Sequence, residues 1–249
     1  MQEKKQKLIF FDTETTGNEQ KDFLVQIAYK IDDESFAAFY KPEIKIPPEV
    51  SAIHHITNKM VENRPAFRES NEWPKIKKLF EDKNSIVVAH NAPFDLMMVK
   101  KEGIEPKKFI CTLRMVRYLD KENKMAQYKL QYLRYLLDLD VEATAHDALG
   151  DVLVLEKLFE YIKNKITEEM ISGSKGMEIT DEKVVEKMIE ISSHPSLLRI
   201  FNFGKHNGKK IDEVTVVDRK YLEWLLAQKL AGDQIDEDWI YTLKHYLEK

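Results

Sequence analysis

Short apolar runs alternate with amphipathic segments along the first two thirds of the chain. Residues 7–12 and 85–90 are nearly continuous apolar runs, which are typical of strands buried on both faces. Residues 23–31 and 35–40 flank a short acidic turn, and this pattern predicts a β-hairpin. A further short strand is expected at residues 109–111.

Apolar side chains at helical spacing predict helices between and after these strands. The clearest helical pattern runs from Leu149 to Ile162. A hairpin followed by alternating helices and strands is typical of an α/β protein with a mixed sheet. The other helices of this region are expected at residues 71–81, 93–102, 113–119 and 130–137. Residues 41–50 contain three prolines and are expected to form a loop.

The α/β pattern ends near residue 167, which indicates a second unit toward the C-terminus. A Ser/Gly-rich linker is expected at residues 172–176, followed by a helix at 181–191. We therefore expect a main domain over residues 1–167, a linker with one helix over 168–195, and a small C-terminal module over 196–249.

The composition is that of a globular protein, and it narrows the possible partners. Hydrophobic residues make up 43% and charged residues 33% of the 249 residues, which is enough for a large core. The longest apolar runs are too short to span a bilayer, so neither a membrane partner nor a secretory signal is expected. A single cysteine fits a reducing cytoplasm, where we expect the protein to act. The net charge of −4 does not exclude nucleic acid, because clustered carboxylates offset basic residues elsewhere.

Three groups of acidic residues lie where a core element meets a loop. Asp12 and Glu14 end the first strand, and their spacing of two places both side chains on one face. Two carboxylates held so close repel each other unless a cation or a proton lies between them. Asp95 follows a second buried strand, and His146 and Asp151 lie around the start of the last helix of the α/β pattern.

Each acidic group alone has an ordinary structural explanation. Asp12 and Glu14 suit a solvated loop rim, and Asp95 suits the positive end of a helix dipole. Asp147 suits a helix cap, with His146 as a surface loop residue. Taken together, these oxygen ligands favour Mg²⁺ or Mn²⁺, and the chain has no Cys/His quartet for zinc.

Three motifs in order resemble the DnaQ-like exonucleases of the ribonuclease-H-like fold. The motifs are Asp-Thr-Glu-Thr-Thr-Gly at residues 12–17, His-Asn-Ala-Pro-Phe-Asp at 90–95 and His-Asp-Ala-Leu-Gly-Asp at 146–151. In the third motif a histidine stands five residues before the last aspartate. In this the chain resembles the branch of the family named for Asp-Glu-Asp-Asp with histidine, whose members include the proofreading epsilon subunit of DNA polymerase III. Residues 7–165 carry the resemblance. One departure is His55, which stands where the family usually has glycine.

The resemblance implies a five-stranded mixed sheet flanked by helices and a 3′→5′ exonuclease with two Mg²⁺ or Mn²⁺ ions. It implies that Asp12, Glu14, Asp95 and Asp151 hold the metal ions and that His146 takes a proton from the attacking water. It also implies substrate contacts near the terminal nucleotide. These contacts are expected from Thr13, Thr15, Thr16, His54, Asn91 and Phe94. For Phe94 a plain core position, and for His54 an ordinary loop histidine, remain open.

The C-terminal residues resemble the terminal module of exonuclease X-type proteins. The resemblance lies in Phe-Gly-Lys-His-Asn-Gly-Lys-Lys at residues 203–210, in Asp218, and in Tyr-Leu-Glu-Trp-Leu-Leu at 221–226. A turn with Lys205, Lys209 and Lys210 is a candidate for phosphate contacts, and a solvated hairpin on a packing module is the alternative.

The expected partner is DNA with a single-stranded 3′ end. The resemblance of the C-terminal residues to exonuclease X-type proteins favours DNA over RNA as the substrate. An exoribonuclease has the same chemistry and stays open. A non-catalytic nucleic-acid-binding module is disfavoured, because it has no need for four acids beside a polyanion. A helical metal phosphohydrolase with an adjacent His-Asp pair is disfavoured by the buried strands. The chain shows no polymerase domain, so any role in proofreading needs a polymerase assembly in trans.

Overall fold

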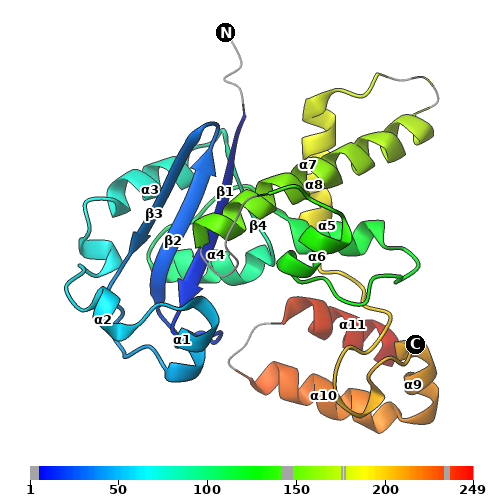
Figure 1. Cartoon of the computed structure of the whole chain (residues 1–249). Coiled ribbons are helices and arrows are strands. Elements are labelled where there is room, and N and C mark those ends of the chain that lie inside the picture. Colours follow the sequence, from blue (N-terminus) through cyan, green and yellow to red (C-terminus); the bar gives the residue numbers. More distant parts are fainter. Residues whose placement is uncertain (1–5, 142–147, 175, 177, 233–235, 249) are drawn as a thin grey trace.

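The core of the protein is a mixed five-stranded sheet, as expected from the sequence. The computed structural model describes residues 6–141, 148–174, 176, 178–232 and 236–248. The strand order is β3-β2-β1-β4-β5; β1 is antiparallel to β2 and parallel to β4, and β5 continues the parallel half (Figure 1). The strands are β1 (Lys7–Thr15), β2 (Leu24–Ile31), β3 (Glu34–Phe39), β4 (Ser85–Ala89) and β5 (Phe109–Cys111).

Helices cover both faces of this sheet because its central strands are apolar on both faces. Ile9 and Phe11 of β1 pack beneath α3 and α4, while Phe10 points to the other face. There its ring meets Phe159 of α7 edge-on, with ring centroids 5.2 Å apart. The first face carries α3 (Trp73–Phe80) and α4 (Ala92–Lys101). Four helices share the core of the second face: α5 (Thr112–Leu119), α6 (Leu130–Leu136), α7 (Ala148–Gly173) and α8 (Asp181–Ser192).

Strand β1 continues three residues beyond the apolar run that predicted it. Asp12 lies opposite Ala28 and Glu14 opposite Gln26 in the antiparallel ladder with β2. The backbone of β2 supplies hydrogen-bond partners whatever the side chains are, so the strand extends through polar residues. Both carboxylates therefore lie within a strand and not in the loop after it.

Short helices follow β3, and the first of them begins inside the proline-rich segment that was expected to form a loop. Helix α1 begins at Pro48, inside the predicted loop over 41–50, because proline suits the first helical position, whose N–H has no partner in the helix. The prediction was wrong for the end of that segment. The elements there are α1 (Pro48–His54), α2 (Asn58–Val61) and the 3₁₀ turn η1 (Phe67–Glu69).

Helix α7 runs through the position where the main domain was expected to end. It continues to Gly173, so the boundary at residue 167 falls inside a helix and the expected linker is shorter. Helix α8 then packs Val184, Val185 and Met188 into the same core as α7. The helix of the segment 168–195 thus shares the main core, and the division into three parts stays a prediction.

The C-terminal helices have a core of their own. Phe201 stacks on Trp239 with ring centroids 5.2 Å apart, and Ile211, Leu222 and Leu243 are buried around them. Figure 1 shows this group beyond α5 and α6, at the end of the molecule toward which β1 runs. The elements are η2 (Gly204–His206), α9 (Ile211–Val217), α10 (Arg219–Ala231) and α11 (Glu237–Leu247). Within the described residues, no helix has the length and apolar character needed to cross a bilayer.

Two arginines of α5 hold the C-terminal helices against the main core. The Arg114 side chain, only 4% exposed, donates to the Ser192 carbonyl at 2.7 Å and to Glu237 at 2.5 Å. Its Nε also lies 3.3 Å from Asp238, and Arg117 pairs with the same carboxylate. Buried charges of this kind need all their partners, because an unpaired one carries its full desolvation cost.

Replacing Asp238 with asparagine is expected to loosen the C-terminal helices. The substitution keeps the shape of the side chain but removes the charge shared by Arg114 and Arg117, at a cost of about 3 kcal/mol. Urea unfolding followed by tryptophan fluorescence tests this, since Trp224 and Trp239 both lie in this region. Glu190→Gln removes an exposed pair with Lys187 and serves as the control with little expected change. Equal unfolding midpoints for Asp238→Asn and the parent chain would contradict a stabilising role for the ion pairs of Asp238 with Arg114 and Arg117.

Candidate active site

Three of the predicted metal ligands converge at one end of β1. Asp12 and Glu14 lie on the face of β1 that also carries Phe10, and this is the face covered by α7. Asp151 lies in the first turn of α7. The packing of Phe10 on α7 therefore places the start of this helix over the acidic end of the strand. One carboxylate oxygen from each of the three acids lies within 4.8 Å of the others.

The three carboxylates fit a divalent metal ion. They are half-buried, and three negative charges at this separation repel each other strongly unless a cation lies between them. All the donor atoms are carboxylate oxygens, which hard divalent cations prefer. Among the residues that the structure describes, no second group of three potential metal-ligating side chains reaches this proximity.

Asp95 approaches β1 from the opposite face and does not join this group. Its Oδ1 accepts hydrogen bonds from the Thr13 N–H at 3.1 Å and from the Thr13 hydroxyl at 2.7 Å. The reason is the alternation of the strand: Thr13 points to the α4 side, while its neighbours point to α7. The side chain is 3% exposed, and loss of water around it raises the pKa of Asp95 to about 7 although the Thr13 bonds lower it.

Asp95→Asn is expected to stabilise the metal-free protein above about pH 7. The pKa of Asp95 is higher in the folded protein, about 7, than its ordinary value of 3.8, so the buried neutral carboxyl contributes to stability in full below pH 3.8. This contribution is lost as the pH rises through about 7. Asparagine keeps the acceptor for Thr13 and never becomes charged. In EDTA at pH 8 we expect a gain of roughly 1–4 kcal/mol in the free energy of unfolding. At pH 4 the variant and the parent should unfold alike in urea; a gain at pH 4 equal to that at pH 8 would contradict the assignment.

The predicted general base, His146, lies outside the described residues. Its role at the carboxylates therefore stays a prediction from the motif at residues 146–151. The described part of that motif begins at Ala148, the first residue of α7.

The hydroxyl groups of the first motif bond within the protein. Besides Thr13, Thr15 donates to the Gly17 carbonyl, and Thr16 donates to Asp22 Oδ1 at 3.0 Å while accepting from the Phe23 N–H. A Cβ at Gly17 would lie 2.4 Å from Asp22 Oδ2, so only glycine fits there without movement. These bonds give the turn after β1 its shape.

His54 supports the same turn from α1. It is 4% exposed, its Nδ1 accepts from the Ile56 N–H at 3.0 Å, and its Nε2 therefore carries the proton donated to the Thr15 carbonyl at 3.2 Å. Burial lowers the pKa of His54, which keeps the ring neutral. The next residue, His55, ends α1 with φ of 61°, in the left-handed region. Glycine adopts this conformation freely, which gives a physical reason for the usual glycine of the family at this position.

The second motif places its residues in three different environments. Asn91 is exposed, with φ of 65°, immediately before α4. Phe94 is half-buried and packs against the core beneath α4. The His90 ring donates from Nε2 to the Tyr128 carbonyl at 2.7 Å and contacts the Thr112 hydroxyl at 2.9 Å. Loss of water around this ring lowers the pKa of His90 to about 4, so it is neutral at physiological pH.

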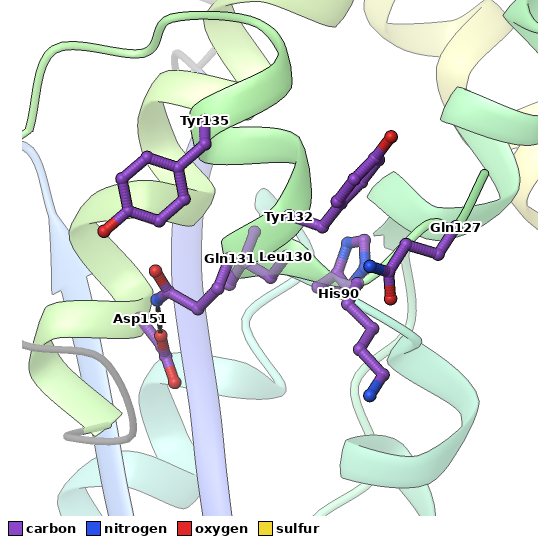
Figure 2. Close-up of a pocket in the computed structure, with 8 residues that line it drawn as sticks. His90, Gln127, Leu130, Gln131, Tyr132, Tyr135 and Asp151 are labelled. Atoms are coloured by element: carbon purple, nitrogen blue, oxygen red, sulfur yellow. Dashed lines mark hydrogen bonds between the residues drawn. The ribbon is translucent and has the colours of Figure 1, made fainter. Parts of the chain in front are cut away.

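A pocket of about 630 Å³ opens beside the carboxylates. Asp151 belongs both to the acidic group and to the wall of this pocket, and Figure 2 shows it among the lining residues. Helix α6 and the segment before it supply most of the wall. The lining residues are His90, Gln127, Lys129, Leu130, Gln131, Tyr132, Tyr135 and Asp151.

One residue at the site was missed by the analysis of the sequence. Gln131 of α6 donates from its amide to Asp151 Oδ1 at 2.5 Å. A glutamine at a polar position of a predicted helix carries no signal, because such residues are common on exposed helical faces. Only the packing of α6 on α7 brings the two side chains together.

Two lysines of the basic turn lie close to acidic residues of the C-terminal helices. Lys205 pairs with Asp218 at 2.6 Å and lies 4.8 Å from the centre of the Tyr221 ring. Lys210 is 3.8 Å from Glu213, and the Lys209 side chain is exposed. Contact of these lysines with nucleic acid stays a prediction.

Comparison with known proteins matches both parts of the chain. The exonuclease family matches residues 9–159, and the exodeoxyribonuclease X-like C-terminal family matches residues 201–229. Exodeoxyribonuclease 10 of Escherichia coli K12 is 30% identical over 217 residues, covering 84% of this chain and 82% of that protein. DNA polymerase III subunit epsilon of Treponema pallidum is 34% identical over 163 residues, covering 60% of this chain and 73% of that protein.

A solved structure agrees with the fold. The structure of exonuclease X in complex with 5′ overhanging duplex DNA matches with a TM-score of 0.56 and 27% identity, over 74% of this chain and 99% of that one. The motifs, the mixed sheet with its three converging carboxylates and the family match over residues 9–159 agree, and the chain belongs to the exonuclease family.

Proposed function

We propose that the protein is a divalent-metal-dependent 3′→5′ exodeoxyribonuclease that releases nucleoside 5′-monophosphates. The observation that carries this proposal is the convergence of Asp12, Glu14 and Asp151 within 4.8 Å at the end of β1. The similarity to exodeoxyribonuclease 10 extends over 84% of the chain and supports DNA as the substrate.

The carboxylates would hold two Mg²⁺ or Mn²⁺ ions. Asp12, Glu14 and Asp151 would supply ligands, and Asp95, which accepts hydrogen bonds from Thr13, would be the fourth acid of the set. When bound, the ions neutralise the scissile phosphate and the charge that develops on the attacking and leaving oxygens.

His146 accepts a proton from the water that attacks the phosphorus atom. The water oxygen forms the new bond to phosphorus, and the bond from phosphorus to the 3′ oxygen of the preceding nucleotide breaks. The 3′ oxygen takes up a proton from solvent and becomes the 3′ hydroxyl of the shortened strand, and the terminal nucleotide leaves as a 5′-monophosphate. A neutral imidazole suits this transfer because it titrates near physiological pH.

The pocket beside Asp151 offers a place for the bound strand. Lys129 supplies a positive charge for a phosphate, and Tyr132 and Tyr135 supply aromatic faces for bases. Asn91, exposed at the start of α4, borders the same end of the sheet and is proposed to contact the terminal nucleotide.

Repair by the protein acting alone is one of two cellular settings for this activity. The match to exodeoxyribonuclease 10 covers more of this chain than the match to subunit epsilon, and the C-terminal helices match an exodeoxyribonuclease X-like family. Proofreading beside a polymerase is the second setting, supported by the 34% identity to subunit epsilon.

A time course with 5′-labelled single-stranded DNA and RNA of one sequence tests the proposal. In Mg²⁺ or Mn²⁺ we expect a ladder that shortens from the 3′ end, faster on DNA, and no cleavage in EDTA. Faster loss of RNA would identify an exoribonuclease instead. Binding of both strands without cleavage in any metal would indicate a non-catalytic nucleic-acid-binding protein.

A further inference from the structure

The carboxylate of Asp151 is held by a side chain outside the three motifs. The Gln131 amide of α6 donates to Asp151 Oδ1 at 2.5 Å, as Figure 2 shows. Asp151 stands in the first turn of α7, where a carboxylate side chain has several rotamers. A hydrogen bond to one oxygen selects the rotamer that brings the carboxylate toward Asp12 and Glu14.

The orientation of the Gln131 amide is itself determined by a neighbour. Arg134, one turn further along α6, approaches Gln131 Oε1 with its Nη1 at 3.5 Å and donates from Nη2 to the Val141 carbonyl. Because a guanidinium only donates, the amide must present its oxygen to Arg134 and its NH₂ group to Asp151. The buried Leu133 between them anchors α6 in the main core.

The relay from Arg134 through Gln131 also lessens the repulsion among the carboxylates. The Gln131 N–H places the positive end of its dipole on Asp151 Oδ1, close to the negative charges of the group. Groups that orient a metal ligand in this way typically change metal affinity by about 10–100-fold when removed. The spacing of Gln131 and Arg134 by three residues places both on one side of α6.

We propose that Gln131 is a positioning residue for metal binding, which fixes the Asp151 carboxylate toward Asp12 and Glu14, and that Arg134 sets its orientation. This inference rests on the proposed function only in that the three carboxylates bind divalent metal ions. Gln131 does not touch the reacting atoms, and its effect should appear in metal affinity before it appears in turnover.

Calorimetric titration with Mn²⁺ in the absence of DNA tests the proposal. Gln131→Met keeps the length of the side chain and removes the donor, and we expect Mn²⁺ to bind about 10–100-fold more weakly. Gln127→Met alters an exposed glutamine in the same pocket wall and should leave Mn²⁺ affinity within about twofold, since surface substitutions of this kind change little. Circular dichroism of each variant checks the fold.

Two further measurements separate positioning from a general structural defect. Saturating Mn²⁺ should return the turnover number of Gln131→Met to near that of the parent. Arg134→Met, which leaves Gln131 in place, should weaken Mn²⁺ binding by a smaller factor than Gln131→Met. Unchanged Mn²⁺ affinity in folded Gln131→Met overturns the proposal, and so does a loss of turnover that saturating metal does not restore.

The design distinguishes this inference from the proposed function. If the parent chain binds Mn²⁺ but degrades no nucleic acid, the exonuclease proposal fails while the titration of Gln131→Met still decides the role of Gln131. If Asp151→Asn binds Mn²⁺ as the parent does, Asp151 is not a metal ligand and the positioning role falls with it.

Discussion

Asp12→Asn is expected to slow nucleotide release by about 10³-fold or more. Asp12 lies opposite Ala28 in the ladder with β2, on the strand face where Glu14 and Asp151 converge. Removing one of three anionic ligands weakens the hold on the metal ions, whose stabilisation of the transition state amounts to several kcal/mol, and each 1.36 kcal/mol is tenfold in rate. The amide is nearly isosteric, so β1 and its pairing with β2 should persist.

The measurement is the initial rate on 5′-labelled single-stranded DNA at saturating Mg²⁺, with circular dichroism to confirm the fold. Asp32→Asn is a matched control, since Asp32 is exposed in the β2–β3 turn at φ of 49°, a conformation that asparagine tolerates. Turnover of Asp12→Asn within about tenfold of the parent would remove Asp12 from the metal site, because a loss of less than 1.4 kcal/mol is too small for a ligand.

His146→Ala is expected to lower the turnover number by about 10²–10⁴-fold while Mn²⁺ binding and DNA binding persist. The reason is that a general base acts on the proton of the attacking water and not on the metal ions or the strand. In the parent chain the rate should rise as pH increases through the range in which an imidazole loses its proton. The variant should lack that rise.

A pH–rate profile between pH 5 and 9, together with calorimetric titration by Mn²⁺, separates these effects. His194→Ala removes an exposed histidine at the end of α8 and is expected to leave the profile unchanged. A His146→Ala variant with near-normal turnover, or with weakened Mn²⁺ binding, would contradict the role of general base.

Local pattern was sufficient for most elements of the sheet and its helices. The strand at Phe109–Cys111 and the starts of β1 and β4 follow from apolar runs that need burial on both faces. Local pattern was insufficient where a neighbouring strand or helix determines how far an element continues. Strand β1 extends through Asp12 and Glu14 because β2 continues its ladder, and α7 continues to Gly173 because its apolar stripe and that of α8 cover each other.

The candidate site divides in the same way. The amino-acid sequence alone determines which acidic residues are present, their spacing of two on β1, and the position of Asp151 in the first turn of a helix. These features follow from the sequence because strand and helix periods are local properties. Only the tertiary structure decided which helix covers each face of β1. It set Asp151 beside Asp12 and Glu14, Asp95 behind Thr13, and the Gln131 amide on Asp151. These contacts join residues 20 to 139 positions apart, and only the packing of helices on the two faces of the sheet brings such residues together.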